Sequence, residues 1–383
     1  MAAALVTEAK SVGIVTINDD SNYGNRLQNY ALQEALRHLG WAPETIRNTP
    51  VPWQRSMLIP RIVDDLRHRP AELLERRTRR LREAVGRSHP AAPSFLGLRR
   101  DANAQFTAAF IRTTQKRFAD APRSYWSERY DRVITGSDQV WNPQYRRANG
   151  MDFLDFASPA TRVSYAASFG VDAVPRFLHA PYARWLEQIP HLSVRERSAA
   201  EVVHALTGRD VPVVLDPTLL LTRAQWDELI ENEPTIESDA YGLRFMIGQL
   251  TPQQEAALAE AAAPSRVADL HDLGSPVHAG VGPVGFVAAI ARASVVITDS
   301  FHASVFALLF RRPLIVRTRF RRDSRITSLL DAHGLELEPT AVDGVGALGD
   351  VDWRAAESAR ERHRADSFAF LHSALNIGDG VGT

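Results

Sequence analysis

The sequence contains no cysteine, which excludes disulfides, thiolate metal sites and a cysteine nucleophile. Lys10 and Lys116 are its only lysines, and because the other basic residues are arginines, any single arginine is a weak functional signal. The totals for Lys+Arg and for Asp+Glu are both 45, so no net charge attracts nucleic acid or an acidic membrane. An anionic ligand would therefore need a local cluster of cations.

Long apolar runs and the common nucleotide and metal motifs are also missing. No stretch approaches about 18 uninterrupted apolar residues, and the N-terminus lacks the basic and apolar segments of a signal peptide. The sequence has no Walker loop, no H-E-x-x-H and no G-x-S-x-G. We therefore expect a cytoplasmic protein with no membrane span, no cofactor, no bound metal and no nucleic-acid partner.

What the chain does contain is a repeated alternation of strand, turn and helix. The first unit pairs an apolar strand, Val12 to Ile17, with a helix of 3.6-residue apolar spacing that ends at Gly40. A second such series begins after an acidic, polar stretch at 231–239, which we interpret as a hinge. The length of 383 residues also suits two domains.

We therefore predict an α/β protein made of two Rossmann-like domains that face each other across a cleft. The predicted domains are residues 1–230 and 231–350. A helix and tail over 351–383 would follow, with the helix Trp353 to Leu375 packing back on the first domain.

Residues from about 55 to 118 differ from the rest of the first domain. They are rich in arginine and helical in period, with interruptions at Pro70 and Pro90. Two interpretations stay open: a solvated helical insertion, or a basic lid that docks an anionic acceptor.

Polar clusters follow several predicted strands. In "VVITDSFHASVFALLF" the strand stops at Asp299, Ser300 and His302, where a helix begins. Free amides and the helix dipole at such a point favour an anion, and a histidine can exchange a proton near neutral pH. The alternative is that Asp299 or Ser300 simply caps the helix and His302 belongs to the core.

Three further turns occupy the same position relative to their strands. They are "NDDSNYGNRLQ" at 18–28, "TGSDQVWN" at 135–142 and "SVRERS" at 193–198. Because the carboxyl ends of parallel strands meet at one edge of a sheet, we expect these acids, amides and arginines to converge on a binding cleft.

Seven stretches of the chain form a recognisable set. They are "NYGNRLQNYALQEAL", "GSDQVWNP", "SYAASFG", "LSVRERS", "VLDPTLLLTRAQW", "ITDSFHASVFALL" and "SRITSLL", in that order between residues 12 and 335. With them the chain resembles the polysaccharide pyruvyl transferase family. The resemblance implies a two-domain fold of the GT-B type. It also implies transfer of pyruvate from phosphoenolpyruvate to a sugar diol as a cyclic ketal, with release of phosphate.

The resemblance also implies which residues hold the donor. By position, the arginine of the "VRE" turn is Arg195 and the histidine is His302. Better-understood members carry Arg-x-His at the second site, whereas Ser300 occupies the arginine position here. Either another arginine takes that role or the donor differs; the candidates are Arg317, Arg319, Arg325 and Arg26.

Ketal formation from an enol phosphate needs a general acid, a general base and fixed positive charge. We expect His302 to be the acid or to protonate the phosphate, with Asp138 or Asp19 as the base. The expected donor-binding residues are Arg195, Ser300, Arg325, Arg26 and Asp299. The expected acceptor-binding residues are Asn22, Tyr23, Gly24, Gln28, Ser137, Gln139 and Asn142, which would hold a glycan or small diol.

Two other functions stay open on the sequence. One is a glycosyltransferase that uses a nucleotide-sugar, whose diphosphate would meet the helix N-terminus at Ser300. The other is a non-catalytic relative that binds glycans.

Overall fold

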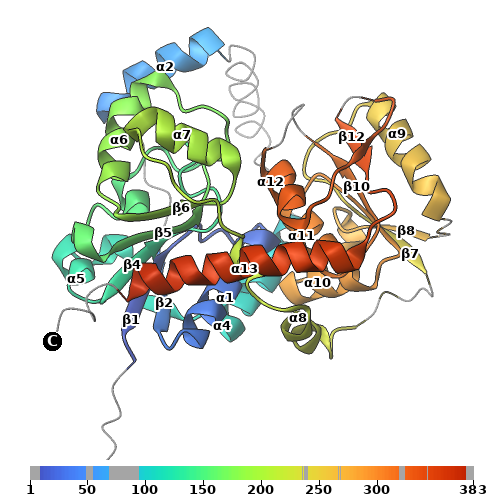
Figure 1. The fold of residues 1–383 in the computed structure, drawn as a ribbon, viewed down its shortest axis with the longest axis horizontal. Helices are drawn as coiled ribbons and strands as arrows, with labels where there is room; N and C mark the ends of the chain where they lie inside the picture. The colour runs from blue at the N-terminus through green and yellow to red at the C-terminus, as the bar shows by residue number, and fades with distance from the viewer. Residues whose placement is uncertain are drawn as a thin grey trace, which may run out of the picture.

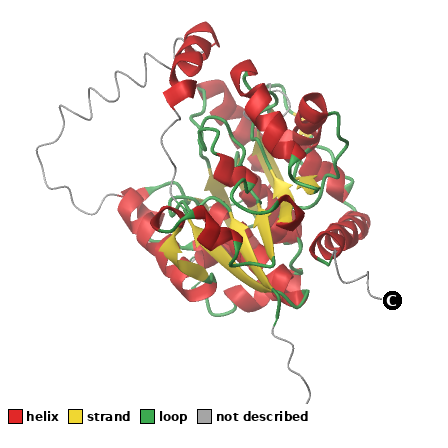
Figure 2. Cartoon of the chain, turned by 90° about the vertical axis from the view of Figure 1, so that its left-hand side faces the viewer, coloured by secondary structure: helices red, strands yellow, loops and turns green. Residues whose placement is uncertain are grey.

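The computed structural model describes residues 9–48, 55–68, 95–234, 236, 240–265, 267, 269–318, 324–342 and 344–376. Two six-stranded sheets lie side by side, each covered by helices (Figures 1 and 2). Part of the predicted hinge, 235 and 237–239, and most of the predicted insertion, 69–94, lie outside the described residues.

The first sheet is parallel throughout, with strand order β3-β2-β1-β4-β5-β6. Its strands are β1 (Ser11–Val15), β2 (Ala42–Arg47), β3 (Thr113–Arg117), β4 (Arg132–Thr135), β5 (Arg162–Ala167) and β6 (His191–Val194). Every residue of β5 is buried, as expected of a strand covered on both faces. This order is that of a Rossmann fold, in which the chain changes direction between β1 and β4.

The helices up to residue 230 are α1 (Tyr23–His38), α2 (Arg55–His68), α4 (Phe95–Phe110), α5 (Arg123–Ser127), α6 (His179–Glu187), α7 (Arg197–Thr207) and α8 (Arg223–Ile230). Of these, α8 packs on the second half of the chain (Figure 1). Helix α1 begins earlier than the sequence indicated. The predicted turn therefore shrinks, and Tyr23, Gly24, Asn25, Arg26 and Gln28 lie in the helix instead.

The second sheet has a parallel centre and an antiparallel edge, in the order β11-β12-β10-β9-β7-β8. Its strands are β7 (Tyr241–Phe245), β8 (Asp269–Asp272), β9 (Val295–Thr298), β10 (Leu314–Arg317), β11 (Glu338–Pro339) and β12 (Val345–Ala347). Its helices are α9 (Pro252–Ala262), α10 (Pro283–Arg292), α11 (Phe301–Leu309) and α12 (Ser324–His333). Here the chain changes direction between β7 and β9.

The two halves share an apolar cluster as well as a connection. Tyr23 of α1 stacks on Phe286 of α10 with 4.7 Å between ring centroids, and its hydroxyl donates to Val281 O (2.9 Å). Phe106 of α4 belongs to the same cluster. At ~25 cal/mol per Å² of apolar surface removed from water, such burial joins the halves more firmly than a hinge alone would.

The prediction that residues 55–118 form a helical insertion is wrong in part, because the strand β3 lies within this range. β3 is an edge strand of polar residues with three exposed positions, so it carries no alternating apolar pattern. Helix α4 is not a solvated arm either, since it packs on α1 and α10, and Arg99 donates to Leu273 O (2.7 Å).

Helix α13 (Trp353–Leu375) has the predicted bounds and crosses both halves (Figure 1). Leu371 and Leu375 pack with Val12 and Ile14 of β1, and Ser367 Oγ accepts a hydrogen bond from Leu215 N (3.0 Å). The helix also contacts α12, so it packs on the second half too. The strands of the two sheets fall within 1–230 and 231–350, and those domain boundaries stay a prediction.

Candidate functional site

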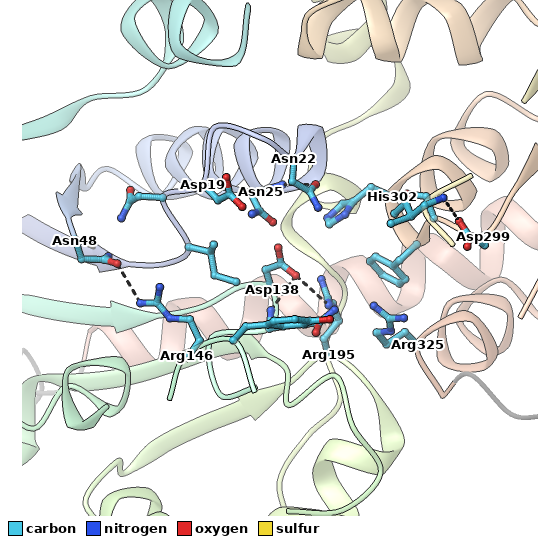
Figure 3. A pocket seen from close by; sticks show the side chains of 17 residues that line it. Asp19, Asn22, Asn25, Asn48, Asp138, Arg146, Arg195, Asp299, His302 and Arg325 are labelled. Atoms are coloured by element: carbon cyan, nitrogen blue, oxygen red, sulfur yellow. Dashed lines mark hydrogen bonds and ion pairs between the residues drawn. The ribbon is translucent and has the colours of Figure 1, made fainter. Parts of the chain in front are cut away.

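A cavity of about 470 Å³ opens where the two sheets present the carboxyl ends of their strands (Figure 3). It is lined by Ile17, Asn18, Asp19, Asn22, Asn25, Asn48, Asp138, Gln139, Tyr145, Arg146, Arg195, Ile247, Asp299, Ser300, Phe301, His302 and Arg325. Most of these residues follow β1 and β4 in one sheet and β7 and β9 in the other, while Asn48 follows β2, Arg195 follows β6 and Arg325 belongs to α12. The cavity thus lies at both points where strand order reverses, the position at which open α/β sheets bind ligands.

Nine of the expected site residues line this cavity. They are Asp19, Asn22, Asp138, Gln139, Arg195, Asp299, Ser300, His302 and Arg325. Six others lie outside its lining: Tyr23, Gly24, Arg26, Gln28, Ser137 and Asn142. Arg319, one of the arginines considered as a substitute, lies outside the described residues.

The residues outside the lining make structural contacts. Arg26 is buried and donates to Ile17 O, and Gln28 donates to Thr16 Oγ1 (2.9 Å). Asn142 donates to Gln139 Oε1 (2.8 Å), which positions one cavity residue. Tyr23 belongs to the apolar cluster between the halves.

Ser300 fills the capping role that the sequence left as an alternative, whereas Asp299 has a structural role that the sequence did not indicate. Ser300 is the N-cap of α11, and its Oγ accepts a hydrogen bond from Ala303 N (3.4 Å). Asp299 accepts hydrogen bonds from two successive amides, Ile247 N (2.6 Å) and Gly248 N (2.8 Å). The carboxylate therefore holds the loop after β7, at one wall of the cavity.

His302 sits in the first turn of α11, 7% exposed, and it reaches toward the first half of the chain. An ideal Cβ placed on Gly24 would lie 2.0 Å from His302 Nδ1. Only glycine leaves room for the imidazole at this point of α1. Gly24 therefore contributes to the site by its missing side chain.

Arg195 follows β6 and is held by three carboxylates. Its Nη1 donates to Asp216 Oδ2 (2.9 Å), its Nη2 lies 3.4 Å from Asp138 Oδ1, and its Nε lies 3.6 Å from Glu196 Oε2. Its guanidinium carbon also lies 4.4 Å from the centroid of the Phe301 ring. We call Arg195, Asp138, Asp216 and Glu196 the arginine cluster.

The cluster is buried, and its charges shift one another. Burial on its own lowers the pKa of Arg195, but Asp138, Asp216 and Glu196 outweigh it and raise the pKa above its usual value. Burial on its own raises the pKa of Asp216, but His302 and Arg195 hold that pKa far below its usual range. Arg195 and Asp216 are therefore both charged at neutral pH.

Asp138 belongs to the arginine cluster and also lines the cavity. Its φ of 71° is in the left-handed region, which aspartate tolerates better than most residues. Its Oδ1 also accepts a hydrogen bond from Gln139 N (2.8 Å). This hydrogen bond and the contact with Arg195 hold the carboxylate of Asp138 at the cavity floor, opposite Asn22 and Asn25 (Figure 3).

The wall built by Asn48, Tyr145 and Arg146 was not predicted from the sequence. Arg146 pairs with both oxygens of Asp152 and donates to Asn48 Oδ1 (3.0 Å). Asn48 in turn donates to Thr16 O (2.9 Å). These side chains come from loops after β2 and β4 that no motif marks.

The opposite wall carries Arg325 of α12, which was predicted to bind the donor. Arg317, another arginine considered for the role of the missing Arg-x-His arginine, is not among the lining residues. Its Nη1 lies 3.4 Å from Asp299 Oδ2. Within the described ranges no group of three histidine, aspartate or glutamate side chains is arranged to hold a metal ion. Nor is any described helix long and apolar enough to cross a membrane.

Comparison with known proteins adds the family. No curated protein matches the chain. Among solved structures, one described as the "Glycotransferase of kitacinnamycin" is similar with 12% sequence identity over 96% of this chain and 95% of that one. Its TM-score is 0.32, which is too low to support an inference about this chain.

The model of the polysaccharide pyruvyl transferase family matches residues 22–319. This range includes β4, β6 and β9, with the residues after each that line the cavity, and it begins at Asn22, the cap of α1. It spans well over half of the sequence. The chain therefore belongs to the polysaccharide pyruvyl transferase family and is a transferase.

Proposed function

We propose that the protein transfers pyruvate from phosphoenolpyruvate to two hydroxyls of a sugar or other diol, forming a cyclic ketal and releasing phosphate. The observation that carries the proposal is the meeting of His302, Asp138 and Arg195 around one cavity at the reversal points of both sheets. The two-lobed, GT-B-like arrangement, with the substrates between the lobes, is part of the proposal.

The donor carries a phosphate and a carboxylate and needs more positive charge than Arg195 supplies. Three carboxylates surround Arg195, so the arginine cluster as a whole is negative. We propose that Arg325 provides the second cation and that the first-turn amides of α11 receive an anionic group. With Ser300 used as the cap, this arrangement replaces the Arg-x-His pair of better-understood members.

The proposed reaction begins with a proton from His302 to the methylene carbon of the enol phosphate. The carbon that bears the phosphate then becomes electrophilic, and an acceptor hydroxyl attacks it as a carboxylate takes the hydroxyl proton. Phosphate leaves with its oxygen, and the second hydroxyl closes the ketal with loss of its own proton. Asp138 is better supported as the base than Asp19, because backbone and Arg195 contacts fix it at the cavity floor.

We propose that the acceptor lies on the side of Asn22 and Gln139, which line the cavity. Asn25 and Tyr145 add an amide and a hydroxyl to the same lining. Amide and phenol side chains can donate and accept hydrogen bonds, which suits a polyhydroxylated acceptor.

The donor assignment can be tested without knowing the acceptor. We expect isothermal titration to detect phosphoenolpyruvate binding and no binding of nucleoside diphosphates. A panel of glycosides with vicinal or 4,6-related hydroxyls should then give phosphate release, with a new ketal methyl signal by NMR. Tight binding of a nucleoside diphosphate with no response to phosphoenolpyruvate would favour a nucleotide-sugar glycosyltransferase. Binding of glycans without phosphate release would favour a non-catalytic relative.

Gly24→Ala should lower turnover sharply, because the new Cβ would meet His302 Nδ1 at 2.0 Å and displace the imidazole. Alanine favours a helix over glycine by about 1 kcal/mol, so the thermal midpoint should not fall as turnover does. Phosphate release and thermal unfolding measure the two effects.

Gly280→Ala is the matched control, since a Cβ there would meet no atom of the described residues within 4 Å, its two chain neighbours apart. Normal turnover in Gly24→Ala would contradict the placement of His302 against α1.

A further inference from the structure

The two ring nitrogens of His302 have different surroundings. Nε2 is fully buried and has no hydrogen-bond partner within the part of the chain that the structure describes. The carboxylate oxygen Asp216 Oδ2 lies 3.6 Å from it. Nδ1 lies close to Gly24, where an added Cβ would be 2.0 Å away, and His302 is one of the residues that line the cavity.

Asp216 cannot turn away from the imidazole, because four hydrogen bonds fix its carboxylate. Oδ1 accepts from Thr218 N (3.1 Å) and from Thr218 Oγ1 (2.7 Å). Oδ2 accepts from Arg195 Nη1 (2.9 Å) and Ser137 Oγ (3.1 Å). The side chain is fully buried, so removing its charge or its acceptors would be costly.

We propose that Asp216 is a positioning residue that holds the proton of His302 on Nε2, so that Nδ1 is the nitrogen that exchanges a proton with substrate. That Nδ1 exchanges a proton with substrate rests on the proposed function. That the proton of the neutral imidazole lies on Nε2 does not, because it follows from the contacts of Asp216 and His302 alone.

The gap of 3.6 Å is longer than a hydrogen bond, and a small rotation of the imidazole would close it. Contacts of this kind are often long in unliganded enzymes and shorten when substrate binds. A carboxylate beside one ring nitrogen fixes the tautomer, since the imidazole must present N–H to it.

The role of Asp216 also explains its ion pair with Arg195, which donor binding by Arg195 does not explain. Arg195 uses its shortest ion pair, 2.9 Å, on Asp216 rather than on the cavity. By keeping that carboxylate charged and in place, Arg195 acts on His302 through Asp216.

Nitrogen-15 NMR of histidine-labelled protein tests the ring assignment without any substrate. Comparison with the His302→Asn variant identifies the His302 signals among those of the 12 histidines. We expect the neutral ring of the wild type to carry its proton on Nε2. A proton on Nδ1 in the wild-type protein would overturn the proposal by itself, whatever any variant does.

The Asp216→Asn variant then tests the cause. Its amide oxygen can replace Oδ1 as the acceptor for Thr218, which leaves an NH₂ group facing Nε2, and the ring proton should move to Nδ1. We expect kcat to fall by about 10²-fold or more, the usual effect of losing one acid–base group, with a smaller change in the KM for phosphoenolpyruvate. In a His302→Asn background the same substitution should cost little further, because the two residues act as a unit.

Asp331→Asn is the matched control, because Asp331 is a partly exposed carboxylate whose partner is Arg197 (3.1 Å). It should change neither the tautomer nor kcat. An unmoved ring proton in a folded Asp216→Asn protein would reject the role of Asp216. Absence of turnover in the wild type, with the proton on Nε2 as expected, would reject the proposed reaction and leave the role of Asp216 standing.

Discussion

His302→Ala should reduce turnover with phosphoenolpyruvate by about 10²-fold or more while leaving the fold intact. In our proposal His302 is the general acid that protonates the methylene carbon, and it is the histidine that lines the cavity. The substitution removes a ring from the first turn of α11, where alanine is a good helix former. Phosphate release measured against time, with thermal unfolding alongside, separates lost chemistry from lost structure.

Chemical rescue sharpens this prediction. The alanine variant leaves space for an imidazole molecule beside the cavity of about 470 Å³. Added imidazole should restore part of the turnover of His302→Ala and none in Asp138→Ala, whose missing carboxylate it cannot replace. Turnover at the wild-type level in His302→Ala without imidazole would remove His302 from the mechanism.

The sequence predicted the repeated strand–turn–helix units well because parallel strands are buried on both faces and read as apolar runs. The helix at Trp353–Leu375 has its predicted bounds. β3 was missed because it is an edge strand, and an edge strand with exposed polar side chains resembles a loop or helix surface in sequence.

The polar turns after the strands led to the cavity for a topological reason. Any residue just past the carboxyl end of a parallel strand lies at one edge of the sheet, so Asp138, Arg195 and His302 could be expected near one another. The role of Asp216 could not be inferred in this way. It follows a short bridge to Val194 rather than a full strand, and in sequence the pair Asp216-Pro217 is indistinguishable from an ordinary turn.

The sequence also could not distinguish a residue that lines the cavity from a residue that holds it in place. Asn142 and Gln139 belong to the same motif, yet only Gln139 reaches the cavity, while Asn142 holds it in place. The same holds for Asp299, whose carboxylate is used by two backbone amides. Which side of a short turn a polar residue faces depends on tertiary contacts, and spacing alone does not contain them.

Arg195→Met should be the most destabilising of the substitutions considered, by about 3–5 kcal/mol, the usual cost of removing one partner from a buried ion pair. Methionine is of similar length but leaves Asp138, Asp216 and Glu196 without their shared cation. Chemical denaturation of the variant and the wild type, followed by the same probe, measures the difference in the free energy of unfolding.

Arg197→Met is the matched control two residues along the chain. The ion pair of Arg197 with Asp331 is largely exposed, at 72% and 46% of the two side chains, so its loss should have little effect. Loss of stability in Arg197→Met equal to that in Arg195→Met would show that the effect comes from the loop and not from the buried charges.

The stability difference between wild type and Arg195→Met should also depend on pH. In the wild type the pKa of Asp216 is lowered in the folded state, so its contribution is present above the unfolded pKa and lost as pH falls through the folded pKa. Without Arg195 the folded pKa of Asp216 rises, so the ionised carboxylate contributes less stability than in the wild type. The stability gap should therefore be widest near neutral pH and should narrow as the pH falls through the folded pKa that Asp216 has in Arg195→Met. A gap that stays constant or widens with acid would mean that the charge of Asp216 does not depend on Arg195.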